Sequence, residues 1–391
     1  MTLYPYSTQS VDESDERELL LALRDSHLTQ GPRVKELEKQ IAAFCGSKYA
    51  LCFNSATSAL FATYHAIKNR LKTDTQNYAI TTPISFVATS NMLLANNIFP
   101  IFADVLPNGS INPKDVRNIL QTHKLRESVS LLVSVDYAGL SVECEELQAI
   151  AEEYNLLWIS DSSHAFGARY KGKRVGTSAL ASVFSFHAIK PITTAEGGAL
   201  VTDDKELYES AYRASNHGIT KTRAWNSDCT EIGFNFRMNE LSAALGLSQL
   251  RKLETFITRR NEIASFYDTY FAKNDFFSTL SCPQDMTSTR HLYPILLYPY
   301  LWCAKEDIFN QLHSRGVGVQ VHYKPIYQFS LYKKHFGEMG LKNADEFYLS
   351  ELSIPCTQTM ELKDAKIVAS IVLEVLESFA SKPFTDYKCR G

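Results

Sequence analysis

Residues 156–202, LLWISDSSHAFGARYKGKRVGTSALASVFSFHAIKPITTAEGGALVT, alternate short apolar runs with polar segments. The runs Leu156–Ser160, Val183–Phe186 and Gly198–Thr202 have the length and residue types of buried strands. SDSSHAFG follows the first run and HAIKPITTAEGG follows the second. Ligands of open α/β sheets bind at the carboxyl ends of strands, so we expect both polar segments to reach one crevice.

The same alternation extends back to residue 49. Four further runs read as strands and three stretches between runs read as amphipathic helices: the strands are 50–53, 78–82, 99–102 and 129–135, and the helices are 56–67, 86–95 and 145–154. Strands that alternate with crossover helices predict an α/β fold with a mostly parallel sheet covered on both faces.

The pattern changes near Met238. Residues 238–271 predict one long helix, because they contain no proline and only Gly246 as a breaker. The segments 291–298 and 318–322, with helices near 308–314 and 364–379, predict a smaller C-terminal α+β domain. We therefore expect a large domain with an N-terminal helical segment over residues 1–245, and the long linking helix and the small domain over residues 246–391.

The overall charge argues against polyanionic partners. The 391 residues include 40 Lys and Arg and 43 Asp and Glu, a net charge of −3, and no basic run stands out. We therefore expect neither nucleic acid nor an anionic membrane as a partner, although a local pocket could still hold one phosphate or diphosphate. The apolar runs are far shorter than the roughly 20 residues of a membrane span, and the acidic first residues do not resemble a signal peptide, so we expect a cytoplasmic location.

Lys190 stands between an apolar strand end and Pro191. Burial there would lower the pKa of its amine and make it a usable nucleophile toward a carbonyl carbon. The alternative is an ordinary lysine that extends its charge to the surface. The sequence leaves both interpretations open.

Asp161 ends the apolar run LLWIS, where a buried carboxylate needs a cationic or hydrogen-bonding partner. A protonated pyridine nitrogen is one such partner, since an ionised Asp keeps that ring an electron sink. An N-cap for the following turn is the simpler alternative. The presence of both Asp161 and Lys190 on adjacent strand ends favours a ligand with a pyridine ring over the N-cap.

Other residues give weaker support for a bound cofactor. Hydroxyls and backbone N–H groups at a helix start in FNSATSAL, residues 53–60, could cradle a phosphate, but serine and threonine there are N-caps in most proteins. Ser185 could add a hydroxyl, and Phe86 could cover a flat ligand, although both have ordinary packing alternatives. His164 and His187 lack further ligands at metal spacing, so no metal site is expected. Nucleophile-elbow, Walker and dinucleotide motifs are absent.

Six motifs together carry a family resemblance: NSATSAL, TTPISFVAT, SDSSHAFG, SFHAIK, EGGALVTDD and GFNFRMNE. In this order they resemble the pyridoxal-phosphate aminotransferases that act on nucleotide-linked 4-keto-sugars, the DegT/DnrJ/EryC1/StrS family of fold-type I (aspartate aminotransferase-like) transferases. SFHAIKPITTAEGG, HYKPIYQ and LTQG look similar to the subgroup that makes pseudaminic acid precursors.

The resemblance implies roles for particular residues. Lys190 matches the lysine that bonds to the cofactor aldehyde, and Asp161 matches the acid at the pyridine nitrogen. The remaining cofactor-binding positions would be Ala56, Thr57 and Ser185 at the phosphate, Phe86 on the ring, His164 near the ring hydroxyl and Asn235 reaching the phosphate of the neighbouring subunit. The substrate-binding positions would be Tyr6, Ser26, His27, Leu28, Thr29, Gln320, Val321, His322 and Tyr323.

The resemblance also implies a reaction and an assembly. L-glutamate would donate its amino group to C4 of UDP-2-acetamido-2,6-dideoxy-β-L-arabino-hexos-4-ulose, giving UDP-4-amino-4,6-dideoxy-N-acetyl-β-L-altrosamine, and a homodimer would have composite sites. A nucleotide-linked 4-keto-6-deoxy sugar of the D-gluco or D-galacto series is an alternative substrate. A sugar dehydratase on the same fold is disfavoured because such enzymes carry His where this chain has Lys190, and a non-catalytic binding protein is a further alternative.

Overall fold

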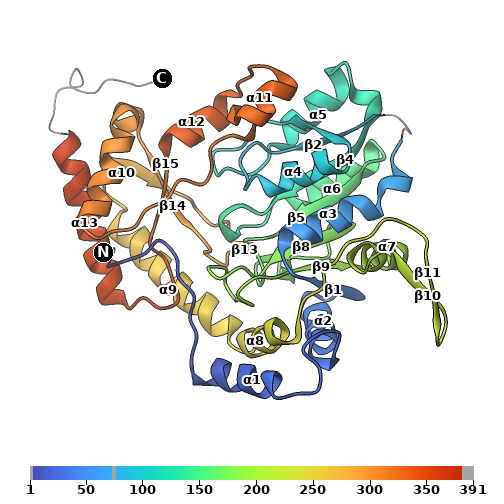
Figure 1. Cartoon of the computed structure of the whole chain (residues 1–391). Helices are drawn as coiled ribbons and strands as arrows, with labels where there is room; N and C mark the ends of the chain where they lie inside the picture. The colour runs from blue at the N-terminus through green and yellow to red at the C-terminus, as the bar shows by residue number, and fades with distance from the viewer. Residues whose placement is uncertain (1–2, 73–75, 381–391) are drawn as a thin grey trace.

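A computed structural model describes residues 3–72 and 76–380, and its centre is a seven-stranded sheet (Figure 1). Its strands, in spatial order, are β1 (Tyr49–Phe53), β9 (Gly198–Thr202), β8 (Ala181–Ser185), β5 (Leu157–Asp161), β4 (Val129–Val135), β2 (Asn77–Thr81) and β3 (Ile98–Phe102). From β8 to β3 every neighbouring pair is parallel, whereas β9 is antiparallel to β8 and to β1. The mostly parallel sheet of the prediction is confirmed, and each predicted strand lies within about two residues of its observed bounds.

Helices cover both faces of this sheet. They are α2 (Pro32–Cys45), α3 (Ala56–Ala66), α4 (Ala88–Ala95), α5 (Pro113–Thr122), α6 (Cys144–Glu153), α7 (Lys205–Ser215) and α8 (Glu240–Leu250). The side chains of β5 show why two layers form, because Ile159 packs with α3 and α7 on one face while Trp158 packs with α5 and α6 on the other. A strand buried on both faces reads as a continuous apolar run, as LLWIS does.

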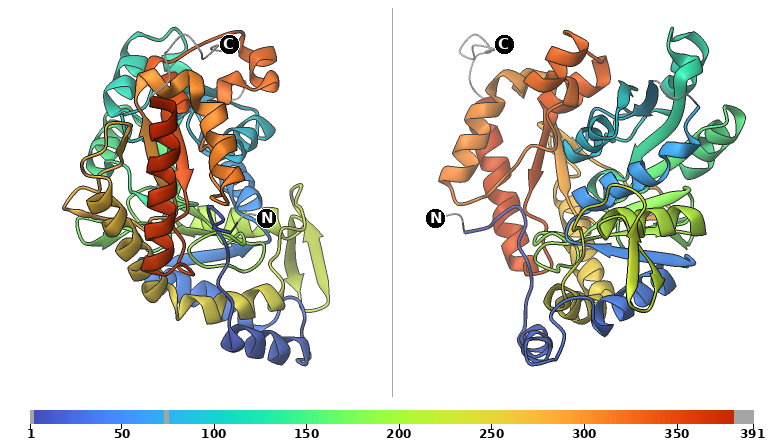
Figure 2. Two further views of the ribbon diagram at one scale, coloured as in Figure 1. Left: turned by 90° about the vertical axis from the view of Figure 1, so that its left-hand side faces the viewer. Right: turned by 45° about the vertical axis from the view of Figure 1, so that its right-hand side comes forward.

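A second, smaller sheet lies beyond the large one. It contains β12 (Phe277–Thr279), β14 (Tyr293–Leu297) and β15 (Glu351–Ile354), all antiparallel, with α10 (Lys305–Ser314) and α13 (Leu362–Ala380) packed on it (Figure 2). Residues 318–322 form no strand of this sheet among the described residues, but Gln320 makes an isolated bridge to Ser353 of β15, and His322 bonds to the side chains of Glu351 and Ser353. The two sheets have separate hydrophobic cores, which supports the proposed domain boundary near residue 245. Near the N-terminus, Tyr4 forms a bridge to Val317 of the smaller part.

The prediction of one helix over residues 238–271 is wrong. The segment forms α8 and α9 (Leu253–Tyr270), separated by a turn at Arg251 and Lys252. Lys252 donates to the carboxylates of Asp12 and Asp15 at the start of α1 (Glu13–Leu23), which fixes the turn. Because α8 packs on α1 and α2 while α9 packs on α13, tertiary contacts override a sequence that would favour continuation.

The remaining elements are peripheral. The hairpin of β10 (Ile219–Arg223) and β11 (Asn226–Cys229) projects from the body with every residue exposed (Figures 1 and 2). The others are β6 (Arg169–Tyr170), β7 (Lys173–Arg174), β13 (Met286–Thr287), α11 (Ser330–Phe336) and α12 (Lys342–Ser350), with short 3₁₀ turns at Lys68–Arg70, Arg126–Ser128, Tyr137–Gly139, Pro299–Ala304 and Ile326–Gln328. Among the described residues, the helices are all too short or too polar to cross a membrane.

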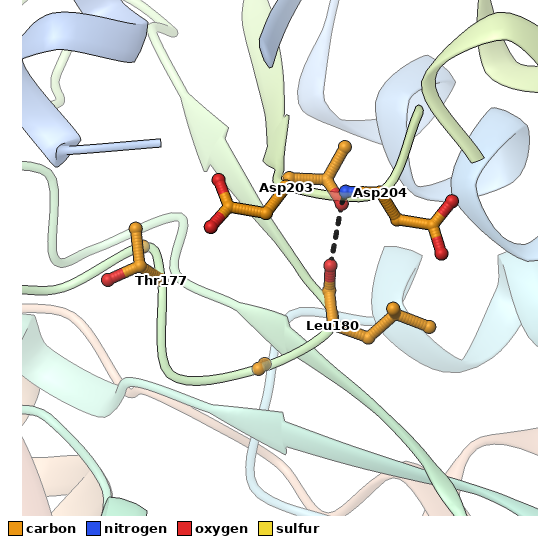
Figure 3. Close-up of a pocket in the computed structure, with 7 residues that line it drawn as sticks. Thr177, Leu180, Asp203 and Asp204 are labelled. Carbon is orange, nitrogen blue, oxygen red and sulfur yellow. Dashed lines mark hydrogen bonds between the residues drawn. The ribbon is translucent and has the colours of Figure 1, made fainter. Parts of the chain in front are cut away.

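A cavity of about 300 Å³ lies at the amino end of β8, away from the polar segments singled out in the sequence (Figure 3). At its wall the hydroxyl of Thr202 donates to the carbonyl of Leu180 over 2.7 Å. Asp204, which also lines the cavity, caps α7 and forms an ion pair with Arg70. The other carboxylate of this cavity, Asp203, accepts the backbone N–H of Lys48 at 2.7 Å, so both carboxylates have partners within the protein.

Candidate active site

The polar segments that follow the strands meet around a cavity of about 770 Å³. It lies at the carboxyl ends of β1, β2, β4, β5 and β8, which all run in the same direction. The first turn of α3, the loop after β2, the loop after β8, His291 and residues 320–324 all line it. The sequence-based expectation of one shared crevice is confirmed by this arrangement.

Asp161 is the last residue of β5, and only 5% of it is exposed. Its carboxylate accepts hydrogen bonds from the hydroxyl of Thr89 at 2.6 Å and the backbone N–H of Ser163 at 3.1 Å. Within the described part of the chain it forms no ion pair at 4 Å or less. A buried carboxylate at a cavity wall can therefore still stabilise a cationic ligand group.

Lys190 lies in the loop after β8, and its Nζ is 3.3 Å from the Nε2 of His291. Burial in the protein lowers the pKa of the Lys190 amine to about 7, although the charge of Asp161 acts in the opposite direction. A large fraction of this amine is then neutral near pH 7, and a neutral amine is a nucleophile and a base.

His164 follows Asp161 by three residues and is buried at the cavity wall. Its Nε2 is 3.2 Å from the hydroxyl of Tyr323, and its ring centroid is 4.4 Å from that of His291. Burial and the nearby charge of Lys190 hold the pKa of both imidazoles well below the usual value, so both are neutral. Their Nδ1 atoms are buried without a hydrogen-bond partner among the described residues.

The first turn of α3 forms one end of the cavity. Ser55 caps this helix by accepting the N–H of Ser58, and the N–H groups of Ala56 and Thr57 lie at a helix start, where no helical acceptor exists for them. Gly198 lets β9 approach closely, because a Cβ at that position would lie 2.5 Å from the backbone nitrogen of Ala56. The hydroxyl residue Ser185 is paired with Gly198 in the sheet and lines the same end. A helix start with adjacent hydroxyls is a site for a phosphate.

Aromatic side chains line the opening of the cavity. Phe86 is 60% exposed although it is a large apolar residue, and its ring centroid lies 6.3 Å from that of Tyr323. Of the residues expected at the sugar, five line this cavity: Tyr6, Gln320, Val321, His322 and Tyr323. The hydroxyl of Tyr137 donates to the backbone carbonyl of His322 at 2.7 Å, which holds the chain at this residue.

The other expected substrate and cofactor positions do not line this cavity. Ser26, His27, Leu28 and Thr29 lie before α2, where Thr29 pairs with Asn239 and Leu28 is 48% exposed. Asn235 is exposed and pairs through its backbone with Asn216. Within one subunit these residues are therefore not brought to the Lys190 amine.

The sequence analysis missed His291 and Thr89. His291 is about a hundred residues away from Lys190 in sequence, at the start of a run that reads only as a strand. Thr89 stands three residues after Phe86 in TTPISFVAT, so the helical spacing was the one available signal. Clusters of three or more side chains able to hold a metal ion are not found among residues 3–72 and 76–380.

Comparison with known proteins identifies the class. The model of the DegT/DnrJ/EryC1/StrS aminotransferase family matches residues 9–373, and the chain belongs to this family. It is accordingly a transaminase that uses pyridoxal phosphate, with the fold of these sugar aminotransferases.

The chain is similar to particular members over nearly its whole length. It is 46% identical over 372 residues to the UDP-4-amino-4,6-dideoxy-N-acetyl-beta-L-altrosamine transaminase of Campylobacter jejuni, covering 95% of this chain and 97% of that protein. It is 44% identical over 379 residues to the Helicobacter pylori transaminase of the same name, with 97% and 99% covered. The structure of Helicobacter pylori PseC, an aminotransferase involved in the biosynthesis of pseudoaminic acid, superposes with a TM-score of 0.92 at 44% identity, covering 96% of this chain and 100% of that one.

The residues around the cavity fit pyridoxal phosphate. Lys190 supplies an amine for its aldehyde, and the buried carboxylate of Asp161 suits a protonated ring nitrogen. The helix start at Ala56 suits the phosphate. A Cβ on Gly198 would push this helix start out of place. The unpartnered Nδ1 of His164 leaves hydrogen-bonding capacity at the wall.

Proposed function

We propose that this chain transfers the amino group of L-glutamate to C4 of UDP-2-acetamido-2,6-dideoxy-β-L-arabino-hexos-4-ulose, giving UDP-4-amino-4,6-dideoxy-N-acetyl-β-L-altrosamine for pseudaminic acid biosynthesis. The observation that carries the reaction type is the Lys190 amine facing the same cavity as the buried Asp161 carboxylate. The identity of the sugar is supported by the 44–46% identity to transaminases named for that product over nearly their full length.

The residues of the chain divide the work of this transfer. When bound, pyridoxal phosphate supplies an aldehyde that carries nitrogen between substrates and a ring that withdraws electrons. The Nζ of Lys190 takes a proton from the α-carbon of the donor in one half-reaction and delivers a proton to sugar C4 in the other. The carboxylate of Asp161 would bind the protonated ring nitrogen, and Thr89 orients that carboxylate.

The other residues expected at the cofactor would bind it and take no part in proton transfer. Ala56, Thr57 and Ser185 would bind the phosphate, and Phe86 would cover one face of the ring. His164 is neutral and buried, so it can exchange a hydrogen bond with the ring hydroxyl without adding charge.

We also propose that the active form is a homodimer in the cytoplasm, where glutamate and nucleotide-linked sugars are both present. Asn235 and residues 26–29 are the expected ligand contacts outside the cavity of their own subunit, so they are candidates to serve the partner's cavity. Exposed apolar side chains near these segments support a covered surface: Leu20, Leu21, Leu23 and Leu28 are 48–57% exposed and Ile232 is 78% exposed.

Side-by-side assays of two nucleotide-linked 4-keto sugars test the substrate. Purified protein should aminate the L-arabino substrate with glutamate, and NMR of the product should show the L-altro configuration. A product formed only from the D-gluco or D-galacto precursor would replace our substrate by that sugar. Turnover of no keto-sugar, by a protein that binds the cofactor, would favour a non-catalytic binding role. Lys190→Ala is the matched control, and it should form no amino sugar.

A further inference from the structure

His291 is the side chain that meets the catalytic amine. Its Nε2 lies 3.3 Å from the Nζ of Lys190, which is hydrogen-bonding distance, and 2% of the residue is exposed. Its other ring nitrogen has no partner among the described residues, so the bond to Lys190 is the polar contact that the ring makes there. The sequence motifs do not include this residue.

The backbone around His291 is held from both parts of the molecule. Arg260, a fully buried residue of α9, donates from Nη1 to the carbonyl oxygens of Arg290 at 3.1 Å and His291 at 3.3 Å. Thr289 donates from its hydroxyl to the carbonyl of His164 at 2.6 Å and from its N–H to the carbonyl of Gly139 at 3.0 Å. These bonds place the imidazole at a fixed point beside the loop that carries Lys190.

The charge state of the His291 ring determines whether it accepts or donates a hydrogen bond in this contact. The groups that face Lys190 and His291 are Asp161 on β5, His164 after β5, Arg260 on α9 and His322 before β15. Burial lowers the pKa of the His291 imidazole, and the nearby Lys190 and Arg260 lower it further, so this imidazole is neutral. A neutral imidazole can accept an N–H of the amine and leave the nitrogen lone pair free.

We propose that His291 is a positioning residue that holds the Lys190 amine, whenever that amine is not bonded to the cofactor, with its lone pair directed at the carbon it deprotonates. An unheld lysine side chain has several rotatable bonds, and a misplaced base transfers protons slowly even when the substrate is bound. This inference rests on the proposed function, because it assigns a role in the same transfer.

Two amide replacements test the position of the nitrogen. The Oε1 of glutamine can reach the place of Nε2, whereas asparagine ends near the place of Nδ1. His291→Gln should therefore keep the glutamate half-reaction, followed by cofactor absorbance without any sugar, within about fivefold of wild type, and His291→Asn should slow its rate constant about thirtyfold with the glutamate KM within about twofold. His291→Phe should resemble His291→Asn, and His313→Gln, a remote histidine exchange near Val319, should have no effect.

A second measurement does not depend on turnover. In cofactor-free protein carrying ¹³C-labelled lysine, the NMR titration midpoint of the Lys190 amine should fall in His291→Asn by about half a pH unit, because the ammonium loses its acceptor, and return in His291→Gln. Equal rates and midpoints in the two amide variants would overturn the inference. If wild-type protein itself shows no absorbance change with glutamate, the proposed function fails instead, while the NMR comparison still decides the Lys190–His291 contact.

Discussion

Thr89 donates its hydroxyl hydrogen to the Oδ2 of Asp161 over 2.6 Å, and both residues are buried. A hydrogen bond to a buried charged group contributes about 1.5–3 kcal/mol, more than a neutral bond does. We expect Thr89→Val to lower kcat/KM about tenfold, because the carboxylate loses the donor that orients it. Steady-state kinetics with saturating cofactor measure this.

The matched control is another buried threonine. Thr63 in α3 donates to the carbonyl of Ala59, one helical turn earlier, at 2.7 Å. Thr63→Val removes the same hydroxyl from a buried site, yet it should change kcat/KM less than about twofold, since such bonds to the preceding turn contribute little. Equal losses in the two variants would show that Thr89 acts through general packing rather than through Asp161.

Gly198→Ala should weaken cofactor binding. The added Cβ would lie 2.5 Å from the nitrogen of Ala56 and 2.6 Å from its Cα, so the first turn of α3 must move away from β9. Overpacking of this kind costs about 1–3 kcal/mol, and we expect the cofactor Kd to rise at least about tenfold. Absorbance titration of cofactor-free protein measures it.

Gly340→Ala provides the comparison for that variant. Its added Cβ would meet only the carboxylate end of Asp345, at 2.9 Å, far from the cavity. The cofactor Kd should stay within about twofold, because a side-chain end can rotate away. An unchanged Kd in Gly198→Ala would contradict the phosphate site at α3.

The pH dependence of stability should reveal Lys190. Its pKa is about 7 in the folded chain and about 10.4 when unfolded, so the unfolded state binds more protons between these values. Cofactor-free wild type should therefore gain stability, relative to Lys190→Met, as the pH rises from about 7 to about 10. Below pH 7 the variant should be more stable by a constant margin, about 2 °C or more in Tm.

Thermal unfolding of both cofactor-free proteins over pH 6–10 gives the comparison. Lys72 exchanged for Met is the control, because its pKa is also lowered but it lies far from the cavity and donates to the carbonyl of Tyr154. The Tm difference between the Lys72 variant and wild type should vary less with pH than the Tm difference between Lys190→Met and wild type. A pH-independent difference for Lys190→Met would mean that this amine has an ordinary pKa in the folded chain.

Periodicity predicted the large sheet because its strands are buried on both faces. Runs such as VSLLVSV at β4 can be read locally, since every residue is apolar or small and the ends carry turn signals. The turn at Arg251 and Lys252 could not be read in that way, because its cause is Lys252 reaching Asp12 and Asp15 across the fold. Local propensity has no information on such contacts.

The same reasoning separates the predicted and the missed residues of the site. Asp161 and Lys190 follow neighbouring strands, and the sheet rule that brings strand ends together needs no further knowledge. His291 reaches Lys190 because the smaller part of the molecule folds back over the sheet, with Thr289 bonded to the carbonyl of His164. That placement depends on how the two parts pack, which no motif in the sequence encodes.

Mixing two inactive variants tests whether subunits share sites. Lys190→Ala removes the amine, and Asn235→Ala removes a side chain that is exposed in its own subunit and expected at the partner's cofactor phosphate. In a heterodimer of the two, shared sites leave one cavity with both defects and the other with neither. Random exchange makes about half of the dimers mixed, so equal mixing should restore about a quarter of wild-type activity.

Tagged subunits allow the mixed dimers to be isolated before the assay, and each variant alone, treated in the same way, is the background. If Asn235 served the cavity of its own subunit, each heterodimer would carry one defect in each cavity, and activity would stay at that background. Recovery therefore requires Lys190 and Asn235 to come from different chains, because no arrangement within one chain gives an intact cavity from these two variants.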